Sequence, residues 1–472
     1  MNLKSRIQNY SNLNNNGGKT IIAKDNTAAS TPAESNNAVP PLTFELLTSK
    51  EMEYKEKIHE KLMEILDLSL IVKMGNADAR KQISDIARRI IDDDSSPIVA
   101  RSRQLIVNEV VNDILGLGPL EHLLYEPTIS DILVNGYGSI YIERFGKIEK
   151  TPITFKDDAH LLKVIDRIVT GVGRRIDESS PLVDARLKDG SRVNAIIPPL
   201  AIDGPSLSIR RFTQDKIQLQ DMVNIGTLSE PMAEVFANIV KVRMNILISG
   251  GTGSGKTTML NAMSNNIPKS ERVVTIEDSA ELQLKMDNLV RLETRPPNIE
   301  GKGEVNQRDL VRNSLRMRPD RIVIGEVRGQ EAFDMLQAMN TGHDGSLTTI
   351  HANSPRDALS RVENMVTMAG FDLPVKTIRS QIASAINVVV QLERMEDGRR
   401  RVISVCEINS MEGDVITMSE IFRFERRGID ENGNIIGQFI STGIVPRFHE
   451  RMKQRGINIS LNVYTDQTFN SL

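Results

Sequence analysis

The segment Asn245–Thr257 reads NILISGGTGSGKT, a short apolar run followed by a glycine-rich stretch. Its last eight residues, Gly250–Thr257, fit the pattern G-x-x-x-x-G-K-[ST], and a helix is expected to begin near Thr257. Glycines let the backbone turn tightly so that successive N–H groups point inward, and the helix N-terminus adds partial positive charge. A strand, this loop and a helix in that order predict a phosphate-binding loop in an α/β fold.

The residue types in the loop indicate their roles. We expect the Lys256 ammonium to reach the β- and γ-phosphates of a nucleotide and the Thr257 hydroxyl to ligate Mg²⁺. The residues expected to surround the phosphates are Gly250, Gly251, Thr252, Gly253, Ser254, Gly255, Lys256, Thr257 and Thr258.

An acidic cluster follows a second strand-like run, VVTIEDSAEL, at Val273–Leu282. A carboxylate at the carboxyl end of a strand, such as Glu277, could activate or orient an attacking water. The alternative is a helix N-terminus, where Asp278 and Glu281 would be favoured by the helix dipole.

A third strand-like run lies in Arg318–Gly329, RPDRIVIGEVRG. Asp320 precedes the strand, whereas Glu326 follows it on the carboxyl side, where open α/β sheets bind their ligands. Glutamate can reach Mg²⁺ through a bound water, because Mg²⁺ loses its waters reluctantly. For Arg318, Arg321 and Arg328 of this stretch, solvent-exposed and subunit-facing roles are equally open.

Two histidines flank a fourth short strand in TGHDGSLTTIHANS, Thr341–Ser354. His343 and His351 could suggest a metal, but no third or fourth soft ligand lies nearby in the sequence, which disfavours zinc. Phosphate sensing or a subunit contact is the favoured interpretation for the pair.

Composition narrows the class of protein. The formal net charge of −3 over 472 residues provides no basic field for nucleic acid, so nucleic acid is disfavoured as the main partner. A single cysteine, Cys406, excludes an intramolecular disulfide and fits a reducing cytoplasm. The sequence has no apolar segment long enough to span a membrane and no signal-peptide pattern, so we expect a cytoplasmic location.

The pattern along the chain predicts several parts. Polar, low-complexity composition predicts a disordered tail. Helical periodicity then indicates a three-helix bundle, and mixed strands and a helix indicate an α+β domain containing an Asp189-Gly190 hairpin turn. Strands alternating with helices indicate a largely parallel sheet covered on both faces. The expected bounds are 1–47 for the tail, 48–128 for the bundle, 129–212 for the α+β domain, 213–230 for a linker and 231–472 for the C-terminal domain with an extension.

Together, and in this order, the four stretches resemble the secretion ATPase superfamily of type II and type IV secretion and type IV pili. In that family they are the Walker A motif, the aspartate box, a Walker B motif of the GE form and the histidine box. The segments LGLGPLEHLL, SDILVNGYGSIYIERFGKIEK and RLKDGSRVNAIIPPLAIDGPSLSIRRF are similar to the CpaF/TadA subgroup, the tight-adherence (Flp) pilus ATPases.

The resemblance implies a RecA-like ATPase domain that binds ATP and Mg²⁺. It implies that Lys256 and Thr257 bind them, that Glu277 is the catalytic carboxylate and that Glu326 supports the metal. It also implies that His343 and His351 couple nucleotide state to neighbouring strands and subunits.

Family members are hexamers whose N-terminal domain donates arginines to the nucleotide. The matching residues are Arg192 and Arg210, with Arg186 and Arg211 as adjacent alternatives, and without the resemblance each could equally be surface charge. The implied partners are identical subunits, an integral inner-membrane platform and, indirectly, pilin subunits, so that membrane association would be peripheral.

Three other functions stay open on the sequence alone. One is an ATPase of a type IV system that secretes DNA or effectors, which shares the four motifs. Another is a DNA-translocating RecA-like motor, and the third is a nucleotide-gated scaffold that hydrolyses little ATP. The direction of pilus movement, extension or retraction, is likewise open.

Overall fold

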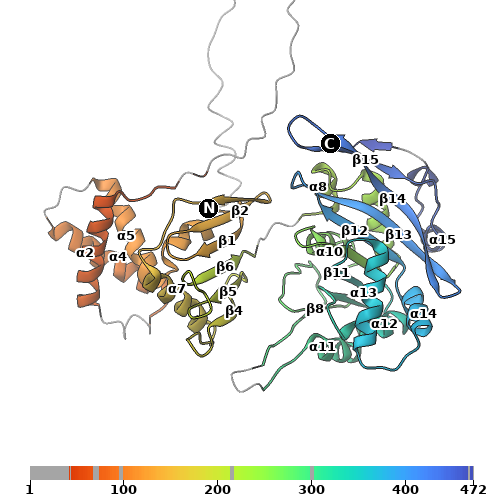
Figure 1. Ribbon diagram of the computed structural model, residues 1–472, viewed down its shortest axis with the longest axis horizontal. Coiled ribbons are helices and arrows are strands. Elements are labelled where there is room, and N and C mark those ends of the chain that lie inside the picture. The colour runs from red at the N-terminus through yellow and green to blue at the C-terminus, as the bar shows by residue number, and fades with distance from the viewer. Residues whose placement is uncertain are drawn as a thin grey trace, which may run out of the picture. The chain divides into compact units, whose positions relative to one another are not determined.

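The computed structural model describes residue 42 and residues 44–66, 74–94, 99–212, 217–297, 302–465 and 468–470. The chain divides into two units, Met1–Leu46 and Leu47–Leu472. The predicted disordered tail over 1–47 lies almost entirely outside the described residues. Everything below concerns the second unit, whose elements are labelled in Figure 1.

In the described part of the second unit, the first helices are α2 (Ser49–Ile65), α4 (Asn76–Asp93) and α5 (Ala100–Leu115). Thr48 and Glu51 cap α2 reciprocally, each side chain accepting from the other's backbone N–H. The three helices share one apolar core, which includes Ile58, Ile83 and Val107. A short 3-10 turn, Gly118–Leu120, and helix α6 (Glu121–Leu124) follow.

A six-stranded antiparallel sheet comes next, in the order β3-β2-β1-β6-β5-β4. Helix α7 (Asp158–Gly171) is capped by Asp157, whose side chain accepts from the His160 N–H. The predicted turn at Asp189-Gly190 joins β4 to β5, and Gly190 adopts φ 95°, a conformation that favours glycine. The strands are β1 (Ile129–Asn135), β2 (Ile140–Arg144), β3 (Lys147–Lys150), β4 (Leu182–Arg186), β5 (Arg192–Ile196) and β6 (Ser206–Arg210).

The predicted linker over 213–230 is folded along much of its length. Residues 213–216 lie outside the described part, but Leu219–Asn224 forms helix α8. Leu219 and Met222 of that helix are buried in the core of the C-terminal domain. The segment is polar in composition, but these two apolar side chains are three positions apart and so lie on the same face of a helix. One helical turn can therefore pack against the core of the C-terminal domain.

The C-terminal domain is built on a ten-stranded sheet in the order β16-β15-β14-β13-β12-β7-β11-β10-β8-β9. Strands β12, β7, β11, β10, β8 and β9 pair with one another in parallel. Strands β13, β14, β15 and β16 continue the sheet beyond β12 through antiparallel pairs. The strands are β7 (Ile246–Gly250), β8 (Val273–Glu277), β9 (Leu289–Glu293), β10 (Arg321–Ile324), β11 (Leu347–Ile350), β12 (Val388–Arg394), β13 (Arg400–Glu412), β14 (Val415–Ile429), β15 (Ile435–Ser441) and β16 (Thr468–Asn470).

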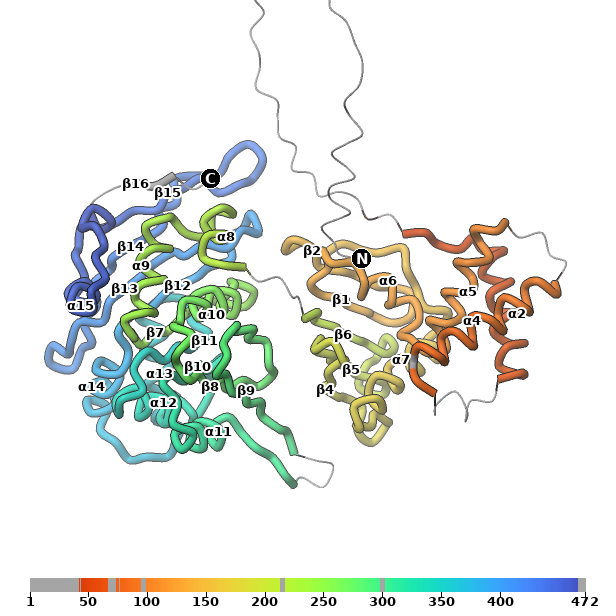
Figure 2. The backbone as a smooth tube through the Cα atoms, turned by 180° about the vertical axis from the view of Figure 1, so that it is seen from behind, coloured from red at the N-terminus to blue at the C-terminus, as the bar shows by residue number. Residues whose placement is uncertain are grey.

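Helices cover both faces of the parallel part (Figures 1 and 2). Ile246 and Ile248 of β7 point into one core and Leu247 into the other, because successive side chains of a strand face opposite ways. The predicted α/β fold, a RecA-like domain preceded by an α+β domain and a helical bundle, is confirmed. The helices are α9 (Glu230–Lys241), α10 (Lys256–Ser264), α11 (Gln307–Ser314), α12 (Glu331–Asn340), α13 (Pro355–Met368), α14 (Val375–Ala385) and α15 (Phe448–Gln454).

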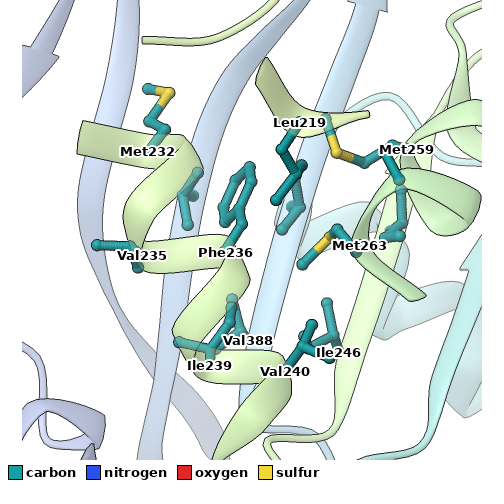
Figure 3. Close-up of a cluster of buried hydrophobic side chains, with 14 of the residues drawn as sticks. Leu219, Met232, Val235, Phe236, Ile239, Val240, Ile246, Met259, Met263 and Val388 are labelled. Carbon is teal, nitrogen blue, oxygen red and sulfur yellow. The ribbon is translucent and has the colours of Figure 1, made fainter. Parts of the chain in front are cut away.

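The first core fixes the helix that carries the phosphate loop. Figure 3 shows Phe236 of α9 reaching toward Leu219 of α8 and toward Met259 and Met263 of α10. Phe236 and both methionines are fully buried. Helix α10 is therefore held against β7 by apolar packing over most of its length.

Arg321, for which a solvent-exposed or subunit-facing role was open, is fully buried. Its Nη2 donates to Glu271 Oε1 at 3.1 Å, its Nε donates to Glu271 Oε2, and its Nη1 donates to Val240 O at 2.6 Å. A Cβ on Gly345 would lie 2.7 Å from Arg321 Nη1, so this position leaves no room for a larger residue. Arg321 ties the amino end of β10 to α9 and to the start of β8.

Replacing Arg321 with Met should lower the free energy of unfolding by up to about 3 kcal/mol, because Glu271 then keeps only Arg243 as an ionic partner. Arg175→Met, which removes an exposed pair with Asp177, should change it by less than about 0.5 kcal/mol. Urea unfolding of the two variants measures both values. An equal, small effect for the two would contradict a structural role for the buried pair.

Candidate nucleotide site

The phosphate loop has the predicted context, between the fully buried strand β7 and helix α10. Gly253 and Gly255 adopt φ values of 70° and 92°, which side chains with a Cβ rarely adopt. At Gly250 a Cβ would lie 2.6 Å from Leu392 O of the neighbouring strand. The glycines are therefore required by backbone conformation at two positions and by a close approach at the third.

Lys256 is buried at the start of α10, and burial lowers the pKa of its ammonium. Its Nζ donates to Gly251 O at 2.8 Å, so the ammonium lies over its own loop. Thr257 and Thr258 follow on the first turn of the helix, both half-buried. A concave loop with a buried cation suits a phosphate group, whose charge would replace a single carbonyl as the partner of Lys256.

Glu277, at the end of β8, is 2% exposed. Its Oε2 accepts from the backbone N–H groups of Glu281 at 2.6 Å and Leu282 at 2.8 Å. Its Oε1 is buried and has no hydrogen-bond partner among the residues that the structure describes. Burial raises the pKa of the carboxyl to about 7, although the two N–H groups oppose the shift.

The alternative reading of this acidic stretch, a helix N-terminus, is wrong. Residues 278–288 form no helix, and the chain instead folds back over the Glu277 carboxylate. A buried carboxylate oxygen without a partner, at the carboxyl end of a strand, has one acceptor position free for a water or another donor.

Glu326 lies beside the phosphate loop at the carboxyl end of β10. His351 joins the two: its Nε2 is 3.1 Å from Glu326 Oε1 and its Nδ1 is 3.5 Å from Lys256 Nζ. Burial first, and the Lys256 charge second, lower the pKa of His351. A neutral imidazole that donates from Nε2 and accepts at Nδ1 fits both neighbours.

Gly325, between the strand and Glu326, explains the GE form of the motif. A Cβ at this position would lie 3.0 Å from Glu277 Cγ. Thr349 Oγ1 donates to Gly325 O at 2.7 Å, and Gln307 Nε2 donates to Glu326 O at 2.8 Å, so the turn carrying Glu326 is held from both sides. The glycine therefore leaves room for the Glu277 side chain beside the turn that carries Glu326.

His343 is not brought to this site. It precedes β11 and so lies at the amino end of the strand, opposite to His351. Its Nδ1 is buried, and within the described part of the chain it has no hydrogen-bond partner. Among the described residues there is no group of three or more His, Cys, Asp or Glu side chains placed to hold a metal ion.

Arg192 and Arg210 of the α+β domain line a cavity of about 260 Å³ together with Thr257, Thr258 and Glu281. Arg192 Nη2 donates to Ser279 O and forms an ion pair with Glu281 Oε1, both at 3.1 Å. Arg210 Nε donates to Asp131 Oδ1 at 3.0 Å. Both guanidiniums therefore border the helix that follows the phosphate loop.

The alternative arginines have other partners. Arg186 forms an ion pair with Glu293 at 3.1 Å, at the end of the edge strand β9. Arg211 also borders the cavity, but its Nη1 donates to the backbone carbonyls of Glu126 and Ile129, the latter at 3.0 Å. The geometry favours Arg192 and Arg210 over these two.

Two arginines beside the loop were missed by sequence reasoning. Arg400 Nε donates to Gly253 O at 2.9 Å, and a Cβ on Gly253 would lie 3.3 Å from Arg394 Nη1. The available signal was the segment QLERMEDGRRR, an apolar strand that ends in a hairpin turn with arginine on both arms. Its relation to the phosphate loop depends on strand order, which the sequence alone did not specify.

Comparisons with known proteins show the family of the chain. A family model described as "Type II/IV secretion system protein" matches residues 113–431. A Mycobacterium tuberculosis protein, named provisionally for conjugal transfer, is 38% identical over 309 residues, which cover 64% of this chain and 87% of that protein. The conjugal transfer protein TrbB of Rhizobium radiobacter is 35% identical over 296 residues, covering 61% of this chain and 86% of its own.

Among solved structures, the VirB11 ATPase of the Brucella suis type IV secretion system, in complex with sulphate, is 29% identical. The match covers 61% of this chain and 95% of that chain, with a TM-score of 0.34.

The raised pKa of Glu277 predicts a pH-dependent stability. Between about pH 4.5 and about pH 7 the folded protein holds a proton that the unfolded chain has released, so the free energy of unfolding falls as the pH rises. Glu277→Gln removes this ionisation. Relative to the wild type, the variant should therefore gain on the order of 3 kcal/mol between pH 4.5 and pH 8. Urea unfolding at the two pH values measures the gain, and a difference that does not change with pH would contradict a buried, ionisable Glu277.

Proposed function

Because the chain belongs to the type II/IV secretion system protein family, we propose that it is a Mg²⁺-dependent ATPase that works as a hexameric motor. One observation carries the proposal. The carboxyl ends of β7, β8, β10 and β11 bring a phosphate loop, a buried carboxylate with a free oxygen, a second carboxylate and a histidine to one edge of the sheet. This set of groups suits phosphoryl transfer to water.

Binding of ATP would begin at the phosphate loop. Lys256 exchanges Gly251 O for the β- and γ-phosphates, and the inward N–H groups of the loop hold the same oxygens. Thr257 would ligate Mg²⁺, and Glu326 would hold one of its waters. When bound, the ion would neutralise part of the negative charge of the phosphates.

Glu277 is the group placed to act on the attacking water. Its Oε2 is held by two backbone N–H groups, so the carboxylate has a fixed orientation, while Oε1 is free to accept from water. A pKa near 7 makes the carboxylate a stronger base than an exposed glutamate while leaving a substantial fraction ionised at neutral pH. Glu277 would thus orient the water and accept its proton.

His351 is placed to report the state of the nucleotide. It contacts both Lys256 and Glu326, so a phosphate that draws Lys256 away would free its Nδ1. Strand β11, which ends one residue before His351, would carry that change across the sheet. For His343, at the other end of the strand, a subunit contact is the role we propose.

Arg192 and Arg210 would stabilise the charge that develops on the transferred phosphoryl group. Each is held by a carboxylate next to the site, Glu281 for Arg192 and Asp131 for Arg210, and we propose that each exchanges that partner for a phosphate. An arginine used in this way contributes about 10³ to 10⁵ in turnover in other phosphoryl-transfer proteins. The exchange would link hydrolysis to movement of the α+β domain.

For the finer function, we propose assembly of a tight-adherence (Flp) pilus, on the subgroup resemblance of the N-terminal segments. The motor would act on an integral inner-membrane platform and, through it, on pilin subunits. No helix in the described ranges is long and apolar enough to cross a membrane, so attachment to the membrane would depend on such partners. Adjacent genes for prepilins and platform proteins would support this function.

The second candidate is an ATPase of a conjugal or type IV secretion system. The names of the two relatives, both assigned to conjugal transfer, favour it. Dependence of DNA transfer on this protein in its own host, without loss of pili on its deletion, would support this candidate over the pilus.

Lys256→Ala and Glu326→Ala should each reduce ATP turnover at least 100-fold, because one removes the phosphate-binding cation and the other the metal support. Phosphate release by the purified full chain measures the effect. Thermal unfolding within about 2 °C of the wild type would show that the variants fold. Arg175→Gln, in an exposed pair of the α+β domain, serves as the control and should retain full turnover. Undiminished hydrolysis by the Glu326→Ala protein would exclude the role in metal support.

A further inference from the structure

The hairpin between β12 and β13 extends past the phosphate loop because of how the strands pair. Leu392 of β12 pairs with Gly250, the last residue of β7, so Arg394 lies just beyond the start of the loop. Arg400 of β13 is directly opposite Arg394 in the antiparallel ladder. Strand register therefore places these two arginines beside the loop.

Both arginines contact the same part of the loop. Arg400 Nε donates to Gly253 O at 2.9 Å, and Arg394 Nη1 lies near the α-carbon of Gly253. Arg394 Nη2 also donates to Gly146 O in the turn between β2 and β3, and it lies 3.7 Å from Glu143 Oε1. One hairpin thus contacts both the phosphate loop and the α+β domain.

Two like charges directly opposite each other destabilise an antiparallel pair. Burial and the neighbouring Arg394 both lower the pKa of Arg400, as expected for cations held close together. The hairpin is nevertheless fixed from within. Asp397 forms a buried ion pair with Arg401 at 3.2 Å and accepts from the Ile435 N–H at 3.0 Å.

We propose that Arg400 and Arg394 are positioning residues of the nucleotide site. Arg400 holds the phosphate loop in its binding shape through Gly253 O, and Arg394 links the loop to the α+β domain through Glu143 and Gly146. The proposal deepens the proposed function and rests on it, because it assumes that the loop binds a nucleotide.

The side of the loop that is contacted distinguishes positioning from direct phosphate contact. A phosphate loop presents its N–H groups to the phosphates. Arg400 donates to the carbonyl of Gly253, so it acts on the backbone of the loop. Loss of Arg400 should weaken every ligand whose β-phosphate occupies the loop, whereas an arginine on the γ-phosphate would favour ATP over ADP.

The test measures the dissociation constants of ADP and of a non-hydrolysable ATP analogue for the full chain by isothermal titration calorimetry. Arg400→Gln should raise both constants about tenfold, which corresponds to about 1.4 kcal/mol, and leave their ratio unchanged. Arg400→Lys keeps one donor and should recover part of the affinity. The thermal unfolding midpoint should stay the same or rise, because a repulsive pair is removed.

Arg426→Gln is the matched control. Arg426 of β14 forms an ion pair at 2.8 Å with Glu396, which lies in the hairpin, and both side chains are exposed. This variant should bind both ligands as the wild type does. If the wild type itself binds neither ligand, the proposed function fails. If the wild type binds both ligands and Arg400→Gln binds them equally well, the positioning role is overturned while the proposed function stands. If Arg400→Gln loses affinity for the ATP analogue alone, the positioning role is also overturned, and direct contact of Arg400 with the γ-phosphate is favoured.

The link through Arg394 has its own measurement. If Arg394 acts through Glu143, the effects of Arg394→Gln and Glu143→Gln on ADP affinity should not add in the double variant. Additive effects would overturn this link while leaving the role of Arg400 intact.

Discussion

The parallel pairing of β7, β11, β10 and β8 is the constraint on which the site depends. Ser249 pairs with Ile350, Thr348 with Ile324, and Ile324 with Ile276, so the four strands end at the same level. Each strand then delivers one functional group within a residue or two of its end. Residues about 100 positions apart in the chain, such as Ser249 and Ile350, meet because their strands are neighbours. The two apolar cores on either face hold the strands in register.

Burial at this edge of the sheet raises the pKa of Glu277 and so makes its carboxylate a stronger base. A carboxylate in solvent would ionise near pH 4.5 and would be a weak base, whereas the buried group titrates near 7. The same burial costs stability at neutral pH, and the structure limits that cost with two backbone N–H groups on one oxygen. Gly325 permits the arrangement, since a side chain there would displace the carboxylate. Stability is thus sacrificed at the position where the proposed reaction needs a base.

The sequence predicted the groups that lie in continuous segments next to strand ends, namely the phosphate loop, Glu277, Glu326 and His351. Local patterns identify these residues because each strand and its following loop are adjacent in the chain. Arg394 and Arg400 escaped notice because their position depends on β12 pairing with β7, more than 130 residues earlier in the chain. For Arg321 the sequence did not distinguish a solvent-exposed role from a subunit contact, because a charged side chain alone suggests exposure. Its partner Glu271 lies just before a different strand, β8, so the buried ion pair depends on tertiary structure. Helix α8 was not predicted because its segment is polar in composition.

The account is tested most directly by a crystal structure of the full chain with Mg²⁺ and a non-hydrolysable ATP analogue. It predicts that Lys256 Nζ leaves Gly251 O for the β- and γ-phosphates and that a water lies between Glu277 Oε1 and the γ-phosphate. A nucleotide bound away from the Gly250–Thr257 loop, or a Glu277 carboxylate still without a water or phosphate neighbour, would contradict it.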